Sequence, residues 1–139
     1  MPATILIVED EADLVPALEY AFRREGFRTV AVASGQSALA LVEAGGIDLV
    51  LLDFMLPDLQ GTEICRRLRA RERTRQLPVI MMTARAEADD VRAGYAAGVD
   101  DYVIKPFRVQ DLVVRVRAAL GRRVTPTKPA PPVMSASLG

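Results

Sequence analysis

Residues 48–53 read Asp-Leu-Val-Leu-Leu-Asp, and this stretch decides the fold. Four consecutive apolar residues between polar ones are typical of a short strand that is buried on both faces of a sheet. Similar apolar runs stand at 3–8, 78–83 and 101–105, and a shorter alternating run stands at 27–32. The sequence therefore predicts five strands, most of them buried.

Stretches of helical periodicity separate these strands. Leu14, Leu18 and Phe22 recur at a spacing of four, and Ser34 has the character of an N-cap for the next helix. The helices are expected near 14–26, 36–44, 62–75, 87–97 and 110–120. Five alternations of strand and helix predict an α/β fold, a doubly wound, flavodoxin-like (βα)5 domain with a five-stranded parallel sheet in the order 2-1-3-4-5.

Length and composition set further limits. The 139 residues suffice for one domain, predicted at 1–123, and a proline-rich tail or linker is predicted at 124–139. The 18 basic and 18 acidic residues balance, so direct contact with nucleic acid is not expected. The single cysteine excludes an internal disulfide, and neither a signal peptide nor a membrane-spanning run is present. A cytoplasmic protein without membrane contact is expected.

Ionisable and hydroxyl side chains follow four of the five predicted strands. Glu9 and Asp10 follow the first strand, and Asp53 ends the third. Thr83 ends the fourth strand and Lys105 the fifth. Ligands of an open parallel sheet bind outside the carboxyl ends of its strands, so these side chains are expected to share one crevice.

Three carboxylates in one crevice repel each other unless a cation joins them. An oxygen-only cluster without His or Cys suits a hard cation, and Mg²⁺ fits before Ca²⁺. With Mg²⁺ present, one of these carboxylates could attack an anionic phosphoryl donor, because carboxylates are known covalent acceptors of phosphoryl groups. Lys105 would supply a point charge and Thr83 a hydroxyl to the new phosphoryl oxygens. All but two of the basic residues are arginine, which makes the lysine at 105 notable.

Four motifs in this order resemble the receiver domain of two-component response regulators. They are Ile-Leu-Ile-Val-Glu-Asp-Glu (5–11), Leu-Val-Leu-Leu-Asp-Phe-Met-Leu-Pro-Asp-Leu-Gln-Gly (49–61), Val-Ile-Met-Met-Thr-Ala (79–84) and Gly-Val-Asp-Asp-Tyr-Val-Ile-Lys-Pro-Phe (98–107). The resemblance covers about residues 3–122, and four motifs at family-like separations make it specific.

The resemblance implies a role for each matched residue. Asp53 would take a phosphoryl group from a sensor histidine kinase or a phosphotransfer protein. Glu9, Asp10, Asp53 and the backbone carbonyl of Met55 would bind Mg²⁺. Thr83, the Ala84 backbone and Lys105 would hold the phosphoryl group, and the bond between Lys105 and Pro106 would be cis. The chain would catalyse only its own phosphotransfer and its slow dephosphorylation, and would not be an enzyme in the ordinary sense.

The resemblance also implies a conformational switch. Thr83 would move toward the phosphoryl oxygens and Tyr102 would turn inward, which changes the face formed by the fourth helix, fifth strand and fifth helix. The motifs are most like those of transcription-regulating receivers of the OmpR/PhoB type, which dimerise through this face. Asp100, Asp101 and Arg115 match that pattern, so a phosphorylation-dependent homodimer is possible. Val91 and Ala97 depart from it, because charged residues usually stand there.

Three other functions are compatible with parts of the pattern. A Mg²⁺-dependent phosphohydrolase would also use a strand-end Asp, but it usually has a second Asp where this chain has Met55. A flavin-binding protein of the same fold would have a neutral phosphate loop after the first strand, where this chain is acidic. An interaction module that is blind to phosphate could keep the fold without the chemistry.

Overall fold

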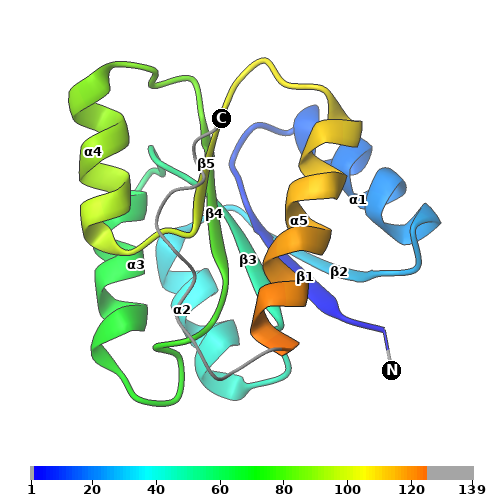
Figure 1. Ribbon diagram of the computed structural model, residues 1–139, viewed down its shortest axis with the longest axis horizontal. Coiled ribbons are helices and arrows are strands. Elements are labelled where there is room, and N and C mark those ends of the chain that lie inside the picture. The colour runs from blue at the N-terminus through cyan, green and yellow to red at the C-terminus, as the bar shows by residue number, and fades with distance from the viewer. Residues whose placement is uncertain (1, 125–139) are drawn as a thin grey trace.

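The computed structural model describes residues 2–124, and in them a layer of sheet lies between two layers of helices (Figure 1). Strands and helices alternate strictly along the chain. In chain order the elements are β1 (Thr4–Val8), α1 (Leu14–Arg24), β2 (Arg28–Val32), α2 (Gly35–Ala44), β3 (Leu49–Asp53), α3 (Gly61–Ala70), β4 (Val79–Thr83), α4 (Ala88–Ala97), β5 (Asp101–Ile104) and α5 (Val109–Val124).

The five strands form one parallel sheet in the order β2-β1-β3-β4-β5, which confirms the predicted fold and strand order. Within the sheet, β2 lies next to β1 on one side, and β3 lies next to β1 on the other side. This order places the carboxyl ends of β1 and β3 next to each other, because Val8 pairs with Leu52. This is the position where folds of this kind bind ligands.

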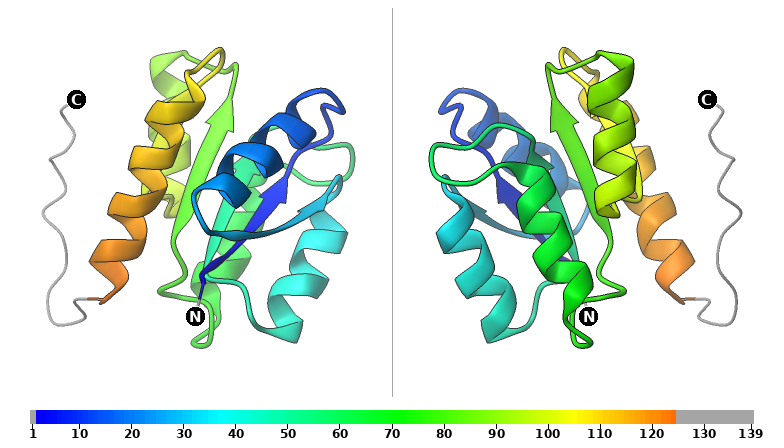
Figure 2. Two further views of the ribbon diagram at one scale, coloured as in Figure 1. Left: turned by 90° about the vertical axis from the view of Figure 1, so that its right-hand side faces the viewer. Right: turned by 90° about the vertical axis from the view of Figure 1, so that its left-hand side faces the viewer.

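Side chains on successive strand residues point to opposite faces of the sheet, and helices cover both faces. Leu6 and Val8 pack with α2, α3 and α4, whereas Ile5 and Ile7 pack with α1 and α5. The two views in Figure 2 show these helix layers from either side. Since both faces are covered, β1 reads as a continuous apolar run, while the edge strand β2 alternates and stays partly exposed.

The predicted helix at 62–75 is wrong at its end, because α3 stops at Ala70 and Arg71 is extended, with φ −105° and ψ 136°. The turn that follows is closed by side chains. The Thr74 hydroxyl donates to the Leu68 carbonyl at 2.6 Å, and the Arg69 guanidinium donates to the Leu77 carbonyl at 2.7 Å. These bonds hold a turn in place of the further helical turns that periodicity predicted.

The other helices agree with the prediction more closely. Ser34 is the N-cap of α2, and its hydroxyl accepts a hydrogen bond from the Ser37 amide at 3.2 Å. Helix α5 runs to Val124, beyond the predicted end at 120, and except for that residue the predicted tail at 124–139 lies outside the described residues. Among the helices of residues 2–124, none combines the length and apolar character needed to cross a bilayer.

Candidate functional site

Three acidic side chains meet at the carboxyl ends of β1 and β3. Asp53 is the last residue of β3, and Glu9 and Asp10 directly follow β1. One carboxylate oxygen from each of the three residues lies within 4.8 Å of the other two. Glu9 and Asp53 are buried, whereas Asp10 is exposed. The strand register thus brings together the acids that the sequence analysis expected to share one crevice.

Lys105 reaches into the same cluster from the end of β5. Its ammonium lies 2.8 Å from Glu9 Oε1, 3.6 Å from Asp53 Oδ2 and 3.3 Å from Glu11 Oε1. The Lys105 backbone amide donates to the Thr83 carbonyl at 2.8 Å, which fixes the lysine beside β4. The bond to Pro106 is cis, the isomer that the resemblance implies.

The pKa shifts show how the charges in the cluster balance. Burial raises the pKa of Glu9 above its ordinary value, the hydrogen bond from Lys105 lowers it in part, and the charge of Asp53 raises it further. Burial lowers the pKa of Lys105, but its hydrogen bond with Glu9 and the charges of Asp53 and Glu9 outweigh this and raise it overall. Burial is thus the main cause of the raised pKa of Glu9, and the contact with Lys105 offsets it only in part.

The loop after β3 is folded back onto Asp53. The Met55 amide donates to Asp53 Oδ1 at 3.3 Å, and the Phe54 carbonyl accepts from the Gly61 amide at 2.7 Å. Met55 and Gln60 form an antiparallel bridge that closes the loop. This arrangement fixes the backbone of Met55, the residue whose carbonyl was predicted as a metal ligand, next to the candidate acceptor.

Thr83 ends β4 on the same rim and is buried. Its hydroxyl oxygen accepts a hydrogen bond from the Arg85 amide at 3.2 Å, which leaves the hydroxyl proton available to another acceptor. Ala84 lies between these two residues and is exposed. Both predicted phosphate-binding positions therefore lie at the carboxyl end of β4, on the same rim of the sheet as the acids at the ends of β1 and β3.

Tyr102 is turned into the protein. Its hydroxyl donates to the Arg85 carbonyl at 2.8 Å, and its ring lies so near Gly94 that a Cβ there would meet Tyr102 Cδ2 at 2.8 Å. Burial raises the pKa of Tyr102 to about 12, so the hydroxyl stays protonated and able to donate at neutral pH. The inward orientation is the one that the resemblance associates with switching.

The structure gives Arg85 a connecting position that the sequence analysis did not assign. Its guanidinium carbon lies 4.7 Å from the centre of the Phe54 ring, and Nη1 lies 3.3 Å from Met55 Sδ. The same guanidinium pairs with Asp90 of α4 at 2.9 Å. Arg85 thus joins the loop after β3 to α4, while its backbone contacts both Thr83 and Tyr102. No local pattern signals this role, because its partners come from three separate segments.

The predicted dimer-face residues make bonds within the chain. Arg115 Nη1 donates to Asp101 Oδ1 at 2.7 Å, and Asp100 Oδ2 accepts from the Val79 amide at 2.8 Å and from Arg69 Nη2 at 3.1 Å. Asp100 therefore anchors the start of β4. The homodimer stays a prediction, since these contacts involve one chain.

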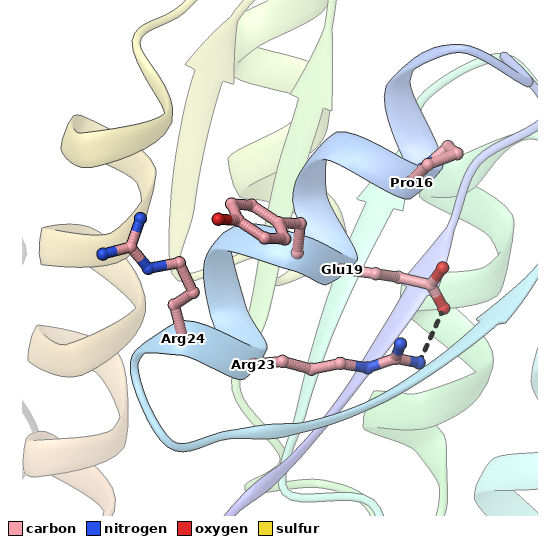
Figure 3. A pocket seen from close by; sticks show the side chains of 5 residues that line it. Pro16, Glu19, Arg23 and Arg24 are labelled. Atoms are coloured by element: carbon pink, nitrogen blue, oxygen red, sulfur yellow. Dashed lines mark hydrogen bonds and ion pairs between the residues drawn. The ribbon is translucent and has the colours of Figure 1, made fainter.

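Figure 3 shows a surface hollow on helix α1. It is lined by Pro16, Glu19, Tyr20, Arg23 and Arg24, and Glu19 pairs with Arg23 at 3.4 Å. None of these residues belongs to the cluster at the ends of β1 and β3.

Comparison with known proteins agrees with this geometry. Residues 5–117 match the model of the response regulator receiver domain. The chain belongs to the response regulator receiver domain family. It is 48% identical over 119 residues to the sensory transduction protein RegX3 of Mycolicibacterium smegmatis, an alignment covering 86% of this chain and 51% of RegX3. It is 45% identical over 118 residues to the phosphate regulon transcriptional regulatory protein PhoB of Rhizobium meliloti, covering 85% and 52%.

These relatives are transcriptional response regulators of the OmpR/PhoB type, which confirms the predicted subfamily. The chain spans about half the length of the curated relatives it matches. A solved structure of the receiver domain of sensor histidine kinase PA1611 from Pseudomonas aeruginosa PAO1 has a magnesium ion coordinated in its active-site cleft. That structure superposes with a TM-score of 0.80 at 34% identity, covering 87% of this chain and 99% of the other.

Proposed function

We propose that this receiver domain accepts a phosphoryl group on Asp53, requires Mg²⁺ to do so, and changes the face formed by α4, β5 and α5 in response. One observation carries the proposal: a buried strand-end carboxylate lies within 4.8 Å of two further carboxylates and 3.6 Å from the Lys105 ammonium. The donor in this proposal is a sensor histidine kinase or a phosphotransfer protein in the cytoplasm.

The residues of the cluster fit Mg²⁺. The available donors are all oxygens, and three carboxylates lie together beside the Lys105 ammonium. Glu9, Asp10, Asp53 and the backbone carbonyl of Met55 would hold the ion. Bound there, Mg²⁺ would supply the positive charge that lets an anionic phosphoryl donor approach a carboxylate.

In the proposed transfer, an oxygen of Asp53 forms a bond to phosphorus as the bond between phosphorus and the donor's histidine nitrogen breaks. The bonding electrons stay with the imidazole as it leaves. Lys105 would bind one phosphoryl oxygen through its ammonium, and Thr83 would donate its free hydroxyl proton to another. The Ala84 amide would serve a further oxygen. The domain would thus promote only its own modification and its slow reversal, without turning over a separate substrate.

A continuous set of contacts supports the proposed switch. Thr83 Oγ1 binds the Arg85 amide, and the Arg85 carbonyl binds the Tyr102 hydroxyl on β5. Movement of Thr83 toward a phosphoryl group would therefore disturb the segment between β4 and α4 and reach Tyr102. Phosphorylation would act by shifting an equilibrium between two arrangements of this segment.

The altered face is the proposed contact surface. It carries exposed Tyr95 of α4 and Val114 of α5 beside the Asp101–Arg115 pair, and a second copy of this chain is the proposed partner after phosphorylation. Because the alignments cover only 51% and 52% of these two relatives, we assign DNA binding to an output segment other than residues 2–124.

The experiment is intact-mass spectrometry after incubation with acetyl phosphate, with and without Mg²⁺, on the parent and on Asp53→Asn. We expect the parent alone to gain one phosphoryl group, and only when Mg²⁺ is present. If both proteins are folded by circular dichroism and neither gains mass, the proposal is refuted and an interaction module blind to phosphate becomes the better account.

A further inference from the structure

Asp58 joins the loop after β3 to a helix that is distant in sequence. Its Oδ1 accepts a hydrogen bond from the Gly35 amide at 2.8 Å, and its Oδ2 accepts one from the Gln36 amide at 2.9 Å. Gly35 and Gln36 are the first two residues of α2, where backbone N–H groups have no partner within the helix. The bond from Gly35, followed by that from Gln36, lowers the pKa of Asp58, so the carboxylate stays charged at neutral pH.

An apolar contact beside Asp58 strengthens this connection. Leu59 packs against the core, and a Cβ added to Gly35 would lie only 3.0 Å from the Leu59 Cβ. The start of α2 therefore approaches the loop so closely that a side chain at position 35 would not fit without movement. Hydrogen bonds from α2 to Asp58 and packing of Leu59 together hold the middle of the loop after β3 against the start of α2.

The two ends of the same loop lie at the candidate acceptor. The Met55 amide bonds to Asp53 Oδ1, and Met55 pairs with Gln60 across the loop. Asp58 lies between these paired residues, so its anchorage to α2 restrains the segment whose backbone borders the acidic cluster.

We propose that Asp58 is a positioning residue for the metal site: by fixing the loop to α2 it holds the Met55 backbone in place for Mg²⁺. This inference rests on the proposed function, because it requires Mg²⁺ to bind at Glu9, Asp10 and Asp53. Asp58 itself contacts no metal in this account. Residues that orient metal ligands without binding the metal often change metal affinity by about 10- to 100-fold when they are replaced.

The competing explanation is that Asp58 only caps α2, and the chain offers a matched control for it. Ser34 caps the same helix through its bond with the Ser37 amide but makes no hydrogen bond to the loop among those described. Ser34→Ala therefore weakens the start of α2 without freeing Asp58. A capping role predicts similar behaviour of the two variants, whereas a positioning role predicts that only the change at Asp58 affects the metal.

The test titrates MgCl₂ into the parent, Asp58→Ala, Asp58→Asn and Ser34→Ala, and follows backbone amide shifts by NMR, with thermal melting of each protein recorded in parallel. We expect Asp58→Ala to weaken Mg²⁺ binding about tenfold and to speed hydrogen exchange of the Gly61 amide. Asp58→Asn keeps one acceptor oxygen and should fall between parent and alanine, and it replaces the alanine variant if that protein does not fold. Ser34→Ala should bind Mg²⁺ as the parent does.

Equal affinities of the parent and the Asp58 variants overturn the inference, even if the variants melt earlier. It is also overturned if Ser34→Ala weakens Mg²⁺ binding as much as Asp58→Ala does, since this would mean that any damage to α2 has the same effect. A parent that shows no Mg²⁺ titration refutes the metal site of the proposed function itself, which distinguishes that failure from a failure at Asp58.

Discussion

Gly61→Ala is expected to disturb the acceptor through a backbone contact. An added Cβ would lie 2.5 Å from the Asp53 carbonyl oxygen and 3.1 Å from both Phe54 Cα and Met81 Sδ. Real Cβ contacts shorter than 3.0 Å are essentially absent, so one backbone segment must move by at least about 0.5 Å. Because the oxygen belongs to Asp53 itself, the crowding falls on the residue proposed to accept the phosphoryl group.

Two opposing terms set the size of the effect. Overpacking of this kind costs about 1–3 kcal/mol, while replacing glycine by alanine in a helix returns up to about 1 kcal/mol. A net loss of about 1–2 kcal/mol corresponds to a fall in Tm of roughly 3–10 °C for a domain of this size. A misplacement of about 1 Å can cost a hundredfold in rate, so a shift of half that size should slow phosphorylation by about tenfold.

The assay combines thermal melting with the initial rate of modification by acetyl phosphate and Mg²⁺. Gly121→Ala is the matched control, because a Cβ at this exposed position of α5 meets nothing within 4 Å. We expect the control to melt at or above the parent temperature and to be modified at the parent rate. If Gly61→Ala behaves like Gly121→Ala in both measurements, the inferred crowding at Asp53 is incorrect.

Three further predictions concern separate parts of the molecule. Met55→Asn should shorten the lifetime of the phosphorylated protein, since a carboxamide can orient water and the thioether cannot; an equal or longer lifetime contradicts this. Burial raises the pKa of Cys65 to about 11, so a disulfide reagent at pH 8 should modify it only after unfolding, and rapid labelling of the native protein argues against its burial. Because the pKa of Asp58 is lowered, its contribution to stability is present above the ordinary value of 3.8 and lost as pH falls through the lower folded value. The parent should therefore lose more stability than Asp58→Asn between pH 6 and pH 3 in urea unfolding, and equal losses contradict the prediction.

The sheet and the acidic cluster could be predicted from sequence because their signals are local. Each central strand is buried on both faces, so its sequence is an unbroken apolar run. The parallel topology then places the residues at the carboxyl ends of β1, β3, β4 and β5 along one rim of the sheet. Glu9, Asp53 and Lys105 meet as this reasoning requires. Their roles in phosphorylation stay predictions that rest on the family and on chemistry.

Contacts between distant segments could not be predicted in the same way. The end of α3 depends on Thr74 and Arg69 reaching carbonyls that come together only in the folded chain. The bridging position of Arg85 and the anchorage of Asp58 to α2 likewise join segments whose sequences carry no matching pattern. Periodicity and capping preferences describe an element by itself, and they do not report what the surrounding fold offers its side chains.

The central claim is that Asp53 itself becomes an acyl phosphate, and chemical trapping tests this most directly. Protein treated with acetyl phosphate and Mg²⁺ is reduced with borohydride, which converts an aspartyl phosphate to homoserine, and is then digested and sequenced by mass spectrometry. The account predicts homoserine at position 53 and unmodified acids at positions 9 and 10. Absence of homoserine from a protein that has gained phosphoryl mass, or its appearance at another position, would contradict it.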